Sequence, residues 1–289
     1  MRGLYLGISF CLALRVSAAP PVATGVSFTD RFIATPNRHG PVMVYIAANS
    51  FLMGSSPEEF GYTPYELRHP VQLSAFSIGK YEVTNAEFCR FLNNQGNQID
   101  GGIPWILTGR SHRCRIQQHG AVFTPVPGFA NHPVVTVSWL GARAYCRWLS
   151  QQTGRNYHLP TEAQWECAAR AGVRTLWDWG NEFAPGRLNW RGYSLDPATT
   201  PVGSFPPNAW GICDMLGNVW EWVLDAFDPE FYLYSPLKDP VFFKDECLTP
   251  GIRGGSFRDS LEFCRPGYRV NMWWWGDYDS IGFRVASQA

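Results

Sequence analysis

The feature that most restricts how this chain can fold is its last quarter, residues 253–285. It contains, in order, Arg253-Gly254-Gly255-Ser256-Phe257, Cys264-Arg265-Pro266-Gly267-Tyr268-Arg269 and the run Trp273-Trp274-Trp275. Adjacent glycines allow a close backbone approach or a positive φ angle, and arginines beside aromatic rings suit stacking and bidentate binding of carboxylates. Because a surface loop rarely needs all of these, we expect the segment to line the functional pocket.

The composition indicates a folded protein with much irregular backbone. Hydrophobic residues make up 45% of the 289 residues and charged residues 17%, which is typical of a chain with a sizeable core. The 28 glycines, 22 prolines and 13 tryptophans predict many turns held by aromatic clusters. The net charge is zero, so bulk electrostatics do not indicate a nucleic-acid partner.

Residues 1–19 have the pattern of a secretory signal peptide. Arg2 supplies a positive start, residues 4–14 form an apolar run, and Ser17-Ala18-Ala19 resembles a cleavage site. The run is shorter than the roughly 20 residues of a membrane-spanning helix, and no later segment reaches that length, so we expect no membrane anchor. The protein is therefore expected to be exported, to the periplasm or outside the cell. Residues 20–40 are interpreted as an N-terminal arm.

Seven cysteines remain after this signal segment, and their odd number leaves at least one thiol unpaired or shared between chains. They are Cys89, Cys114, Cys146, Cys167, Cys213, Cys247 and Cys264. None belongs to a C-x-x-C pair, which argues against a zinc ribbon or a thioredoxin-type site. A free cysteine is also commonly a small buried hydrophobic residue, and we expect this for about half of them.

Local patterns predict several short strands and three helices. We expect strands at 43–46 and 50–54 around a turn, a half-buried strand at 71–78, and a strand at 134–137. Helices are expected to begin after Thr84, Ser138 and Thr161, because each can cap a helix and two of them belong to a capping box. Residues 94–131 are interpreted as a long irregular loop.

Residues 211–223 contain oxygen-bearing groups of the kind that calcium prefers. Asp214, Asn218, Glu221 and the carbonyl groups beside Gly217 could act as hard ligands. Aspartate and asparagine beside glycine also build turns without any ion. Both interpretations remain open from the spacing alone.

The order of seven short motifs resembles the sulfatase-modifying-factor family, which includes the formylglycine-generating enzymes. The motifs are Phe51-Leu52-Met53-Gly54-Ser55, Tyr81-Glu82-Val83-Thr84-Asn85, Pro133-Val134-Val135-Thr136-Val137-Ser138-Trp139, Leu159-Pro160-Thr161-Glu162-Ala163-Gln164-Trp165-Glu166, Gly217-Asn218-Val219-Trp220-Glu221-Trp222, Arg253-Gly254-Gly255-Ser256 and Gly282-Phe283-Arg284. The resemblance covers residues 41–287. It implies one α+β domain with a C-type-lectin-like core, in which two main helices pack on twisted antiparallel strands amid much irregular structure.

The resemblance also implies a structural calcium ion. The family ligands would correspond here to Asp214, Gly217, Val219 and Glu221, through side chains and carbonyl groups. A second family calcium site would fall near Asn189 and Trp190, and its other ligands cannot be identified in this sequence.

The best-known activity of the family oxidises a sulfatase cysteine to formylglycine with O2 and a copper(I) ion held by two cysteine thiolates. Aligned from Arg253, Cys264 corresponds to the second thiolate and Asp259 to the first. A hard carboxylate is a poor replacement for a thiolate on copper(I), so copper is not expected here. Family disulfides do not transfer either, since Cys146 matches one cysteine but its partner position is Val285.

The first hypothesis is therefore an exported enzyme of the same oxidative class that acts on a peptide or a siderophore precursor, as relatives in pyoverdine maturation do. Its catalytic pocket would contain Glu262, Asp259, Ser256 and Cys264, with a carboxylate as general base and O2 as a possible co-substrate. Substrate would be bound by Arg253, Arg265, Arg269, Trp273 and Trp274. For Arg265 and Arg269, a buried ion pair with a core carboxylate is an equal alternative.

Two other functions are weighed. The first is a non-catalytic C-type-lectin-like binding module, in which residues 273–278 form an exposed aromatic platform for a peptide, glycan or aromatic ligand. This idea would fail if all three indoles were buried. The second is the copper-dependent formylglycine reaction with unusual ligands. The sequence identifies neither the substrate nor the oligomeric state.

Overall fold

The computed structural model describes residues 23–109, 111–244, 246–275 and 278–289. The expected signal peptide at 1–19 lies outside the described residues. Four helices are present in the described part, and local sequence explains the three longer ones. They are α1 (Asn85–Gln95), α2 (Trp139–Thr153), α3 (Glu162–Arg170) and the single turn α4 (Phe231–Tyr234).

The helix starts confirm the local signals. Thr84 and Thr161 each cap a helix in a complete capping box, and the Ser138 hydroxyl accepts a hydrogen bond from the Gly141 N–H. Gly154 ends α2 in the left-handed conformation. The family resemblance implied two main helices, whereas the structure has the three that the capping signals predicted.

Two sheets form the centre of the molecule. The first has the order β1-β2-β5-β15-β10 and the second has the order β13-β12-β11-β14. All pairs are antiparallel except β11 with β14. Their bounds are β1 Ser27–Arg31, β2 His39–Ile46, β5 Phe76–Gly79, β10 Tyr157–His158, β11 Trp220–Ala226, β12 Pro250–Arg253, β13 Arg269–Asn271, β14 Ile281–Gly282 and β15 Ala286–Gln288.

Three hairpins complete the strands that the structure describes. They are β3 (Asn49–Met53) with β4 (His69–Leu73), β6 (Ile99–Asp100) with β7 (Ile103–Pro104), and β8 (Ile116–His119) with β9 (Val122–Pro125). The α+β class and the lectin-like architecture expected from the sequence are therefore confirmed. Much of the chain between residues 171 and 219 is irregular.

The strands expected at 43–46 and 50–54 around a turn are confirmed as the end of β2 and as β3, and they belong to different sheets. Four other expectations need correction. The strand expected at 71–78 is two strands, β4 and β5, separated at residues 74–75. Residues 134–137 form no strand, since only Val137 makes an isolated bridge, to Ile106, and Thr136 has a φ of 59°, outside the β region. The expected loop at 94–131 contains the hairpins β6–β7 and β8–β9, and the N-terminal arm contains β1.

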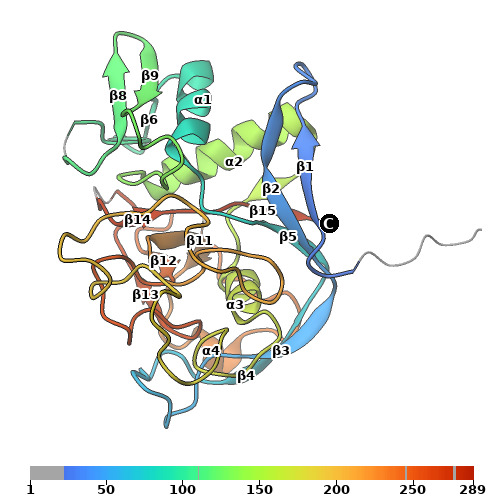
Figure 1. Cartoon of the computed structure of the whole chain (residues 1–289). Coiled ribbons are helices and arrows are strands. Elements are labelled where there is room, and N and C mark those ends of the chain that lie inside the picture. Colours follow the sequence, from blue (N-terminus) through green and yellow to red (C-terminus); the bar gives the residue numbers. More distant parts are fainter. Residues whose placement is uncertain (1–22, 110, 245, 276–277) are drawn as a thin grey trace, which may run out of the picture.

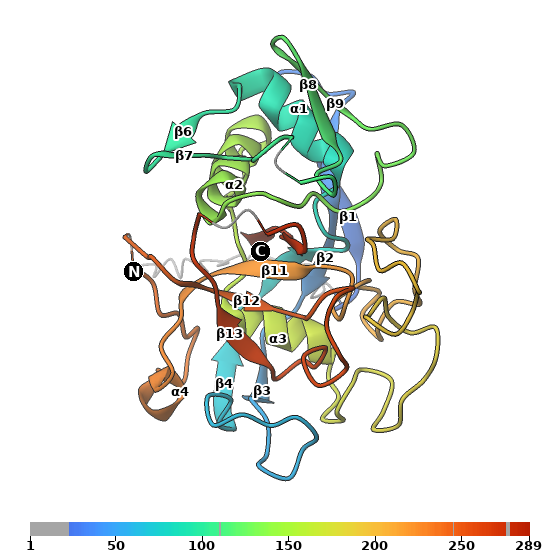
Figure 2. The same cartoon turned by 90° about the vertical axis from the view of Figure 1, so that its left-hand side faces the viewer.

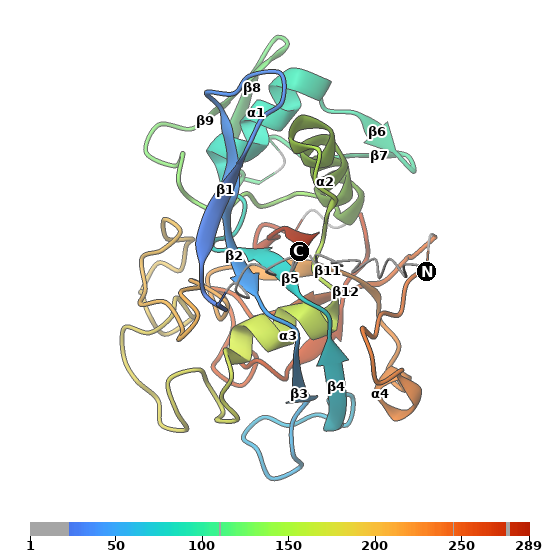
Figure 3. The ribbon, with the colours of Figure 1, turned by 90° about the vertical axis from the view of Figure 1, so that its right-hand side faces the viewer.

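Strand β11 lies between two helices and positions the functional residues. Figures 1 and 2 show α2 above the sheet of β11, β12 and β13, and α3 below it. The Trp139 indole of α2 donates to the Val223 carbonyl, and the Trp165 indole of α3 donates to Glu221, at 2.8 and 2.7 Å. Figure 3 shows the edge of the other sheet, with β1, β2 and β5 beside the same two helices. Six of the seven residues of β11 are buried, so the strand is covered on both faces.

Candidate functional site

The paired glycines behave as the sequence predicted. Gly254 and Gly255 have φ angles of 99° and 74°, which favour glycine. A Cβ atom on Gly255 would lie 2.6 Å from the Cys264 sulfur atom, so a side chain does not fit there. This close approach places the turn at 254–256 directly against the segment that carries Cys264.

Three of the arginines assigned to substrate binding are fully buried in ion pairs. Arg253 contacts Glu166 at 2.5 Å, Arg265 contacts Glu66 at 2.9 Å, and Arg269 contacts Glu162 at 2.9 Å. Their guanidinium groups also bind carbonyl groups of distant loops, including those of residues 266, 61 and 228. These contacts agree with the alternative in which the arginines form buried ion pairs. None of the three faces solvent, where a substrate would arrive.

The arginines around Glu166 hold its carboxylate in the charged form. Burial alone would raise the pKa of Glu166, but Arg170 and Arg253 reverse this effect, so that its pKa lies below the ordinary value. Breaking such a buried pair typically costs about 3–5 kcal/mol. The arginines therefore fix the backbone around the site and leave its chemistry to other groups.

Asp259 and Ser256 form a small polar group, in which Ser256 is fully buried and Asp259 is partly exposed. Asp259 is half-buried, and the Ser256 hydroxyl donates a hydrogen bond to its carboxylate. Burial raises the pKa of Asp259, and hydrogen bonds from Ser256 and Trp220 partly oppose this rise. A carboxylate with an elevated pKa and a partly open face is suited to accept a proton from a substrate.

Aromatic rings line one side of this carboxylate. The ring centroids of Trp220 and Tyr268 are 5.9 Å apart, and those of Tyr268 and Phe263 are 5.0 Å apart. On another side Arg258 makes an ion pair with Asp279 at 2.8 Å, with both side chains partly exposed. The site therefore combines one proton acceptor, an aromatic wall and a charged rim.

Glu262 is a weaker candidate for the base. Its side chain is partly exposed, as that of Asp259 is, but hydrogen bonding from Ser260 lowers its pKa. A carboxylate with a lowered pKa gains little by accepting a proton at neutral pH. Of the two carboxylates that the sequence suggested, the geometry favours Asp259.

Cys264 is fully buried, and its backbone carbonyl accepts a hydrogen bond from the Trp177 indole at 2.8 Å. Burial raises the pKa of the Cys264 thiol strongly, and the nearby carboxylates of Asp259 and Glu262 raise it further. A protonated thiol beside a carboxylate is a donor set that does not fit copper(I), which prefers two thiolates. The other six cysteines among the described residues are also buried and carry free thiols.

The segment expected to hold calcium has a distinct electrostatic character. Glu221 binds Arg284 through both carboxylate oxygens at 2.7 Å, and Asp214 and Glu82 lie near the same pair. Burial, followed by repulsion from Asp214 and Glu221, raises the pKa of Glu82 well above its ordinary value. Burial raises the pKa of Asp214 to about 6. We call Glu82, Asp214 and Glu221 the acidic cluster.

Two oxygens of the acidic cluster have no hydrogen-bond partner among the described residues. They are Glu82 Oε2 and Asp214 Oδ1, and both are buried. Unpaired buried carboxylate oxygens are costly, and a hard cation is the group that would satisfy them. The residues present therefore fit calcium, although no three acidic, histidine or cysteine side chains of the described chain already form a metal-binding group. Two of the four family ligands, Gly217 and Val219, would contribute backbone carbonyls, which such a group of side chains would not include.

Asn189, near the second family calcium position, is buried and already engaged. Its side-chain amide donates to the Ala198 carbonyl and to Asn218 Oδ1, and its own carbonyl accepts from the Asn218 N–H at 2.7 Å. These bonds connect the irregular loops around residues 190–200 to the turn at 217–218. Asn189 is not part of the acidic cluster, but it holds the turn at 217–218 beside it.

The tryptophan run is partly exposed. Trp273 and Trp275 have 47% and 39% of their surfaces exposed, and their rings stack at 4.7 Å. Trp274 packs instead against the main core. Gly276 and Asp277, which the platform hypothesis included, lie outside the described residues. Since two indoles are exposed, the condition that would have ended the platform hypothesis is not met.

Two contributors were not singled out from the sequence. Glu82 was read only as part of a family motif, and residues 78–83, which also contain Lys80, give it no local signal of burial. Asp279 had no pattern of its own and is identified by its contacts with Arg258, Arg113 and Ser111. Among the described residues, no helix is long and apolar enough to cross a membrane.

A family model described as a sulfatase-modifying factor enzyme 1-like domain matches residues 29–289. The chain is 34% identical to a formylglycine-generating enzyme of Streptomyces coelicolor over 85% of this chain and 89% of that protein. It is also 33% identical to the serine/threonine-protein kinase Pkn1 of Chlamydia trachomatis, over 93% of this chain but only 42% of the kinase.

Among solved structures, PvdO from Pseudomonas aeruginosa is similar over 93% of this chain and 100% of that chain. Its TM-score is 0.75 and the sequence identity is 32%. The similarity therefore extends over most of this chain.

Proposed function

The chain belongs to the family of sulfatase-modifying factor enzyme 1-like proteins, and we propose that it is an exported oxidative maturation enzyme acting on a peptide or siderophore precursor instead of a sulfatase cysteine. The observation that carries this proposal is the half-buried Asp259, with its raised pKa, next to a fully buried Cys264. The similarity to PvdO over its whole length is consistent with it. Export rests on the signal-peptide pattern in residues 1–19.

In this proposal Asp259 is the general base. Its carboxylate is held by the Ser256 hydroxyl, and the aromatic wall of Trp220 and Tyr268 would place a substrate group against it. The base takes a proton from the substrate as two electrons leave. O2 accepts both electrons and, with two protons, becomes hydrogen peroxide, so that the substrate loses two hydrogen atoms in total.

Calcium would have a structural role in the same protein. The side chains of Asp214 and Glu221 and the carbonyls of Gly217 and Val219 would hold it, as in the family. The ion would neutralise part of the excess negative charge of the acidic cluster. Glu221 precedes Trp222 and follows Trp220 on β11, so a stable cluster would also stabilise the wall of the active site.

The test uses a ferribactin-type siderophore precursor with the purified protein, O2 and a copper chelator. We expect mass spectrometry to show a product lighter by two hydrogen atoms. A Cys-x-Pro-x-Arg peptide incubated with copper(I) and O2 should stay unmodified. Conversion of this peptide, with no change in the precursor, would overturn the proposal in favour of the formylglycine reaction.

Two variants form a matched pair for the base. Asp259→Asn should lower the rate of precursor oxidation by about 100-fold, the usual contribution of a general base. Glu262→Gln should leave the rate within about twofold, because its pKa is lowered and its carboxylate is already charged. If Glu262→Gln has the large effect and Asp259→Asn the small one, the base is Glu262.

A second candidate function is supported by the exposed stack of Trp273 and Trp275. A non-catalytic binding module would use this surface for a glycan or an aromatic peptide. Trp273→Ala should then abolish ligand binding, measured by tryptophan fluorescence, in a protein that oxidises no precursor. An active enzyme whose rate is unaffected by Trp273→Ala would exclude this alternative.

A further inference from the structure

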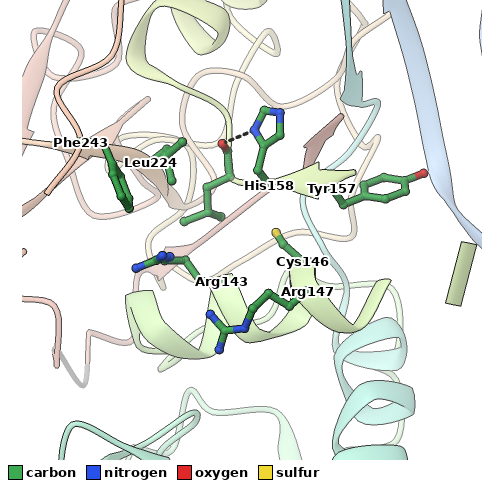
Figure 4. Close-up of a pocket in the computed structure, with 8 residues that line it drawn as sticks. Arg143, Cys146, Arg147, Tyr157, His158, Leu224 and Phe243 are labelled. Atoms are coloured by element: carbon green, nitrogen blue, oxygen red, sulfur yellow. Dashed lines mark hydrogen bonds between the residues drawn. The ribbon is translucent and has the colours of Figure 1, made fainter. Parts of the chain in front are cut away.

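Two cavities outside the proposed active site differ in the state of their arginines. Figure 4 shows the first, of about 220 Å³, with Arg143, Cys146 and Arg147 of α2 along one side. Both of these arginines already have contacts, since Arg143 lies over the Trp139 ring and Arg147 pairs with Asp100. The second cavity, of about 180 Å³, lies between β3 and the end of α3. We call it the β3–α3 cavity.

The β3–α3 cavity has both apolar and polar walls. The apolar wall consists of side chains of β3, of the turn after α3 and of a more distant loop, namely Phe51, Leu52, Val173 and Trp210. An apolar cavity of about 150 Å³ binds benzene, so there is room here for one aromatic ring. Phe51 and Trp210 are both partly exposed, which leaves their rings accessible to a ligand.

Arg174 gives the polar wall a positive charge that has no partner in the described part of the chain. It lies in the turn after α3, its side chain is exposed, and it makes no hydrogen bond or ion pair with the described residues. None of the described residues that line the cavity is an aspartate or a glutamate. A guanidinium group in such surroundings is available to an anion, and its planar donors match a carboxylate.

Arg170 is buried in the same wall and keeps one nitrogen group unused. Its Nε donates to Glu166 and its Nη2 donates to the Gly54 carbonyl, both at 2.8 Å. Glu166 also pairs with Arg253, so two guanidinium groups share one carboxylate and the three side chains together carry a positive charge. The Nη1 group of Arg170 donates to none of the described residues, yet it is not enclosed. This group remains for a ligand in the cavity.

Groups that would repel an anion are neutral or already bonded. Burial raises the pKa of the Cys167 thiol to about 12, so the thiol stays protonated, and it donates to Asn49 at 3.4 Å. At the end of α3 the carbonyl groups of residues 167, 168 and 170 accept from the Ala171 N–H, the Asn208 amide and the Val173 N–H. The helix end therefore presents little free negative charge to the cavity.

We propose that the β3–α3 cavity binds a small aromatic carboxylate, with its ring against Phe51 and Trp210 and its carboxylate between Arg174 and Arg170. The two arginines select an oxyanion, because charge-assisted hydrogen bonds to a carboxylate are strong. The rings and the size of the cavity select a flat apolar group beside that charge. The site is independent of the oxidation proposed above, since neither Asp259 nor Ser256 lines it.

Calorimetric titration of the whole protein with benzoate, benzamide, acetate and inorganic phosphate tests the proposal. We expect one site for benzoate. Benzamide has the same shape without the charge and should bind about tenfold more weakly or worse, and acetate, which lacks the ring, should also be weaker by about tenfold or more. No binding of benzoate, equal affinities for benzoate and benzamide, or phosphate binding as tight as that of benzoate would overturn the proposal.

Variants localise the site. Arg174→Met removes the charge without breaking an internal contact, so it should weaken benzoate by about tenfold or more and leave benzamide unchanged. Arg38→Met, in the turn between β1 and β2, is the matched control, because Arg38 is exposed and does not line the cavity. Its affinity for benzoate should equal that of the wild type.

The ring wall is tested separately. Trp210→Ala should weaken benzoate by about tenfold and leave acetate unchanged, since only benzoate has a ring to pack there. Phe51→Ala provides a second variant of the same wall if the first does not fold. Benzoate affinity that is unchanged in Arg174→Met, or unchanged in the folded ring variant, would contradict the site.

Discussion

Two neighbouring residues on β11 divide the functional centre of this protein into two contrasting sites. Because successive side chains of a strand point to opposite faces, Trp220 faces Asp259 and Tyr268, while Glu221 faces Arg284 and the acidic cluster. The first site combines a carboxylate with a buried thiol. The second combines three carboxylates with the guanidinium of Arg284.

The difference between the two sites lies in their donor types. In the family alignment Asp259 takes the position of a copper thiolate, and burial raises the pKa of the remaining Cys264 thiol, so this donor set suits copper(I) poorly. In the second site all the side-chain donors are hard oxygens, and two of these oxygens have no hydrogen-bond partner among the described residues. We therefore propose that the family framework keeps a calcium position here, while Asp259 serves proton transfer where the family places copper.

The largest effect is expected from replacing Arg284, the positively charged side chain that pairs with the acidic cluster. Arg284→Met leaves three buried carboxylates without their guanidinium and several carbonyls without a donor, which should lower the free energy of unfolding by about 4 kcal/mol. Arg258→Met is the control on the Trp220 side. Its ion pair with Asp279 is partly exposed, and its loss should cost less than about 1 kcal/mol. Equal effects in urea unfolding would contradict the contrast between the sites.

The next largest effect concerns pH in calcium-free buffer. The pKa of Asp214 is raised from 3.8 to about 6, so between these values the folded state binds more protons than the unfolded state. Stability should therefore fall as pH rises from about 4 to about 6, by up to about 3 kcal/mol. Asp214→Asn should remove this part of the slope, while any contribution from Asp225, whose pKa is raised to about 7, stays the same in both proteins.

Asparagine suits this position because Asp214 has a φ of 55°, a conformation that asparagine tolerates. Urea unfolding at each pH would measure the free energy of unfolding of both proteins. Parallel profiles for wild type and Asp214→Asn would show that the acidic cluster carries no excess charge.

A smaller effect is expected from calcium itself. At a concentration 100-fold above its dissociation constant, calcium should stabilise the protein by about 2.7 kcal/mol, which corresponds to a rise in Tm of roughly 5 °C for a chain of this size. Magnesium should do little, because it demands a smaller octahedral site. Asp214→Ala should abolish the calcium-dependent rise. A wild-type Tm that is insensitive to both calcium and chelator would refute the site.

Features determined by local sequence could be predicted well. The caps at Thr84, Ser138 and Thr161 lie within a few residues of the groups they bind, so the helix starts were correct. The strand at 134–137 failed because Thr136 adopts a left-handed conformation that tertiary packing imposes. The single strand at 71–78 failed because alternation continues across the break between β4 and β5.

The candidate site stays a prediction, and its contacts show what the sequence could not supply. The segment 253–285 carries Ser256, Asp259 and Cys264, and its alignment with the family identified Asp259. The partners of the arginines could not be predicted from the sequence, since Arg265 binds Glu66, which lies 199 positions away. Likewise, the Glu82 carboxylate of the acidic cluster accepts a hydrogen bond from Asn218, which lies 136 positions away in the sequence. Long-range contacts of this kind are fixed by the fold and have no local signature.

The most direct test of the central claim, that Asp259 has converted a copper position into a proton-transfer site, is copper(I) titration of the wild-type protein and the Asp259→Cys variant. Restoring a second cysteine beside Cys264 should recreate a two-thiolate site. We predict that the variant binds one equivalent of copper(I) against a competing chelator and that the wild type binds none. One tightly bound copper(I) in the wild type, lost in Cys264→Ser, would contradict the account.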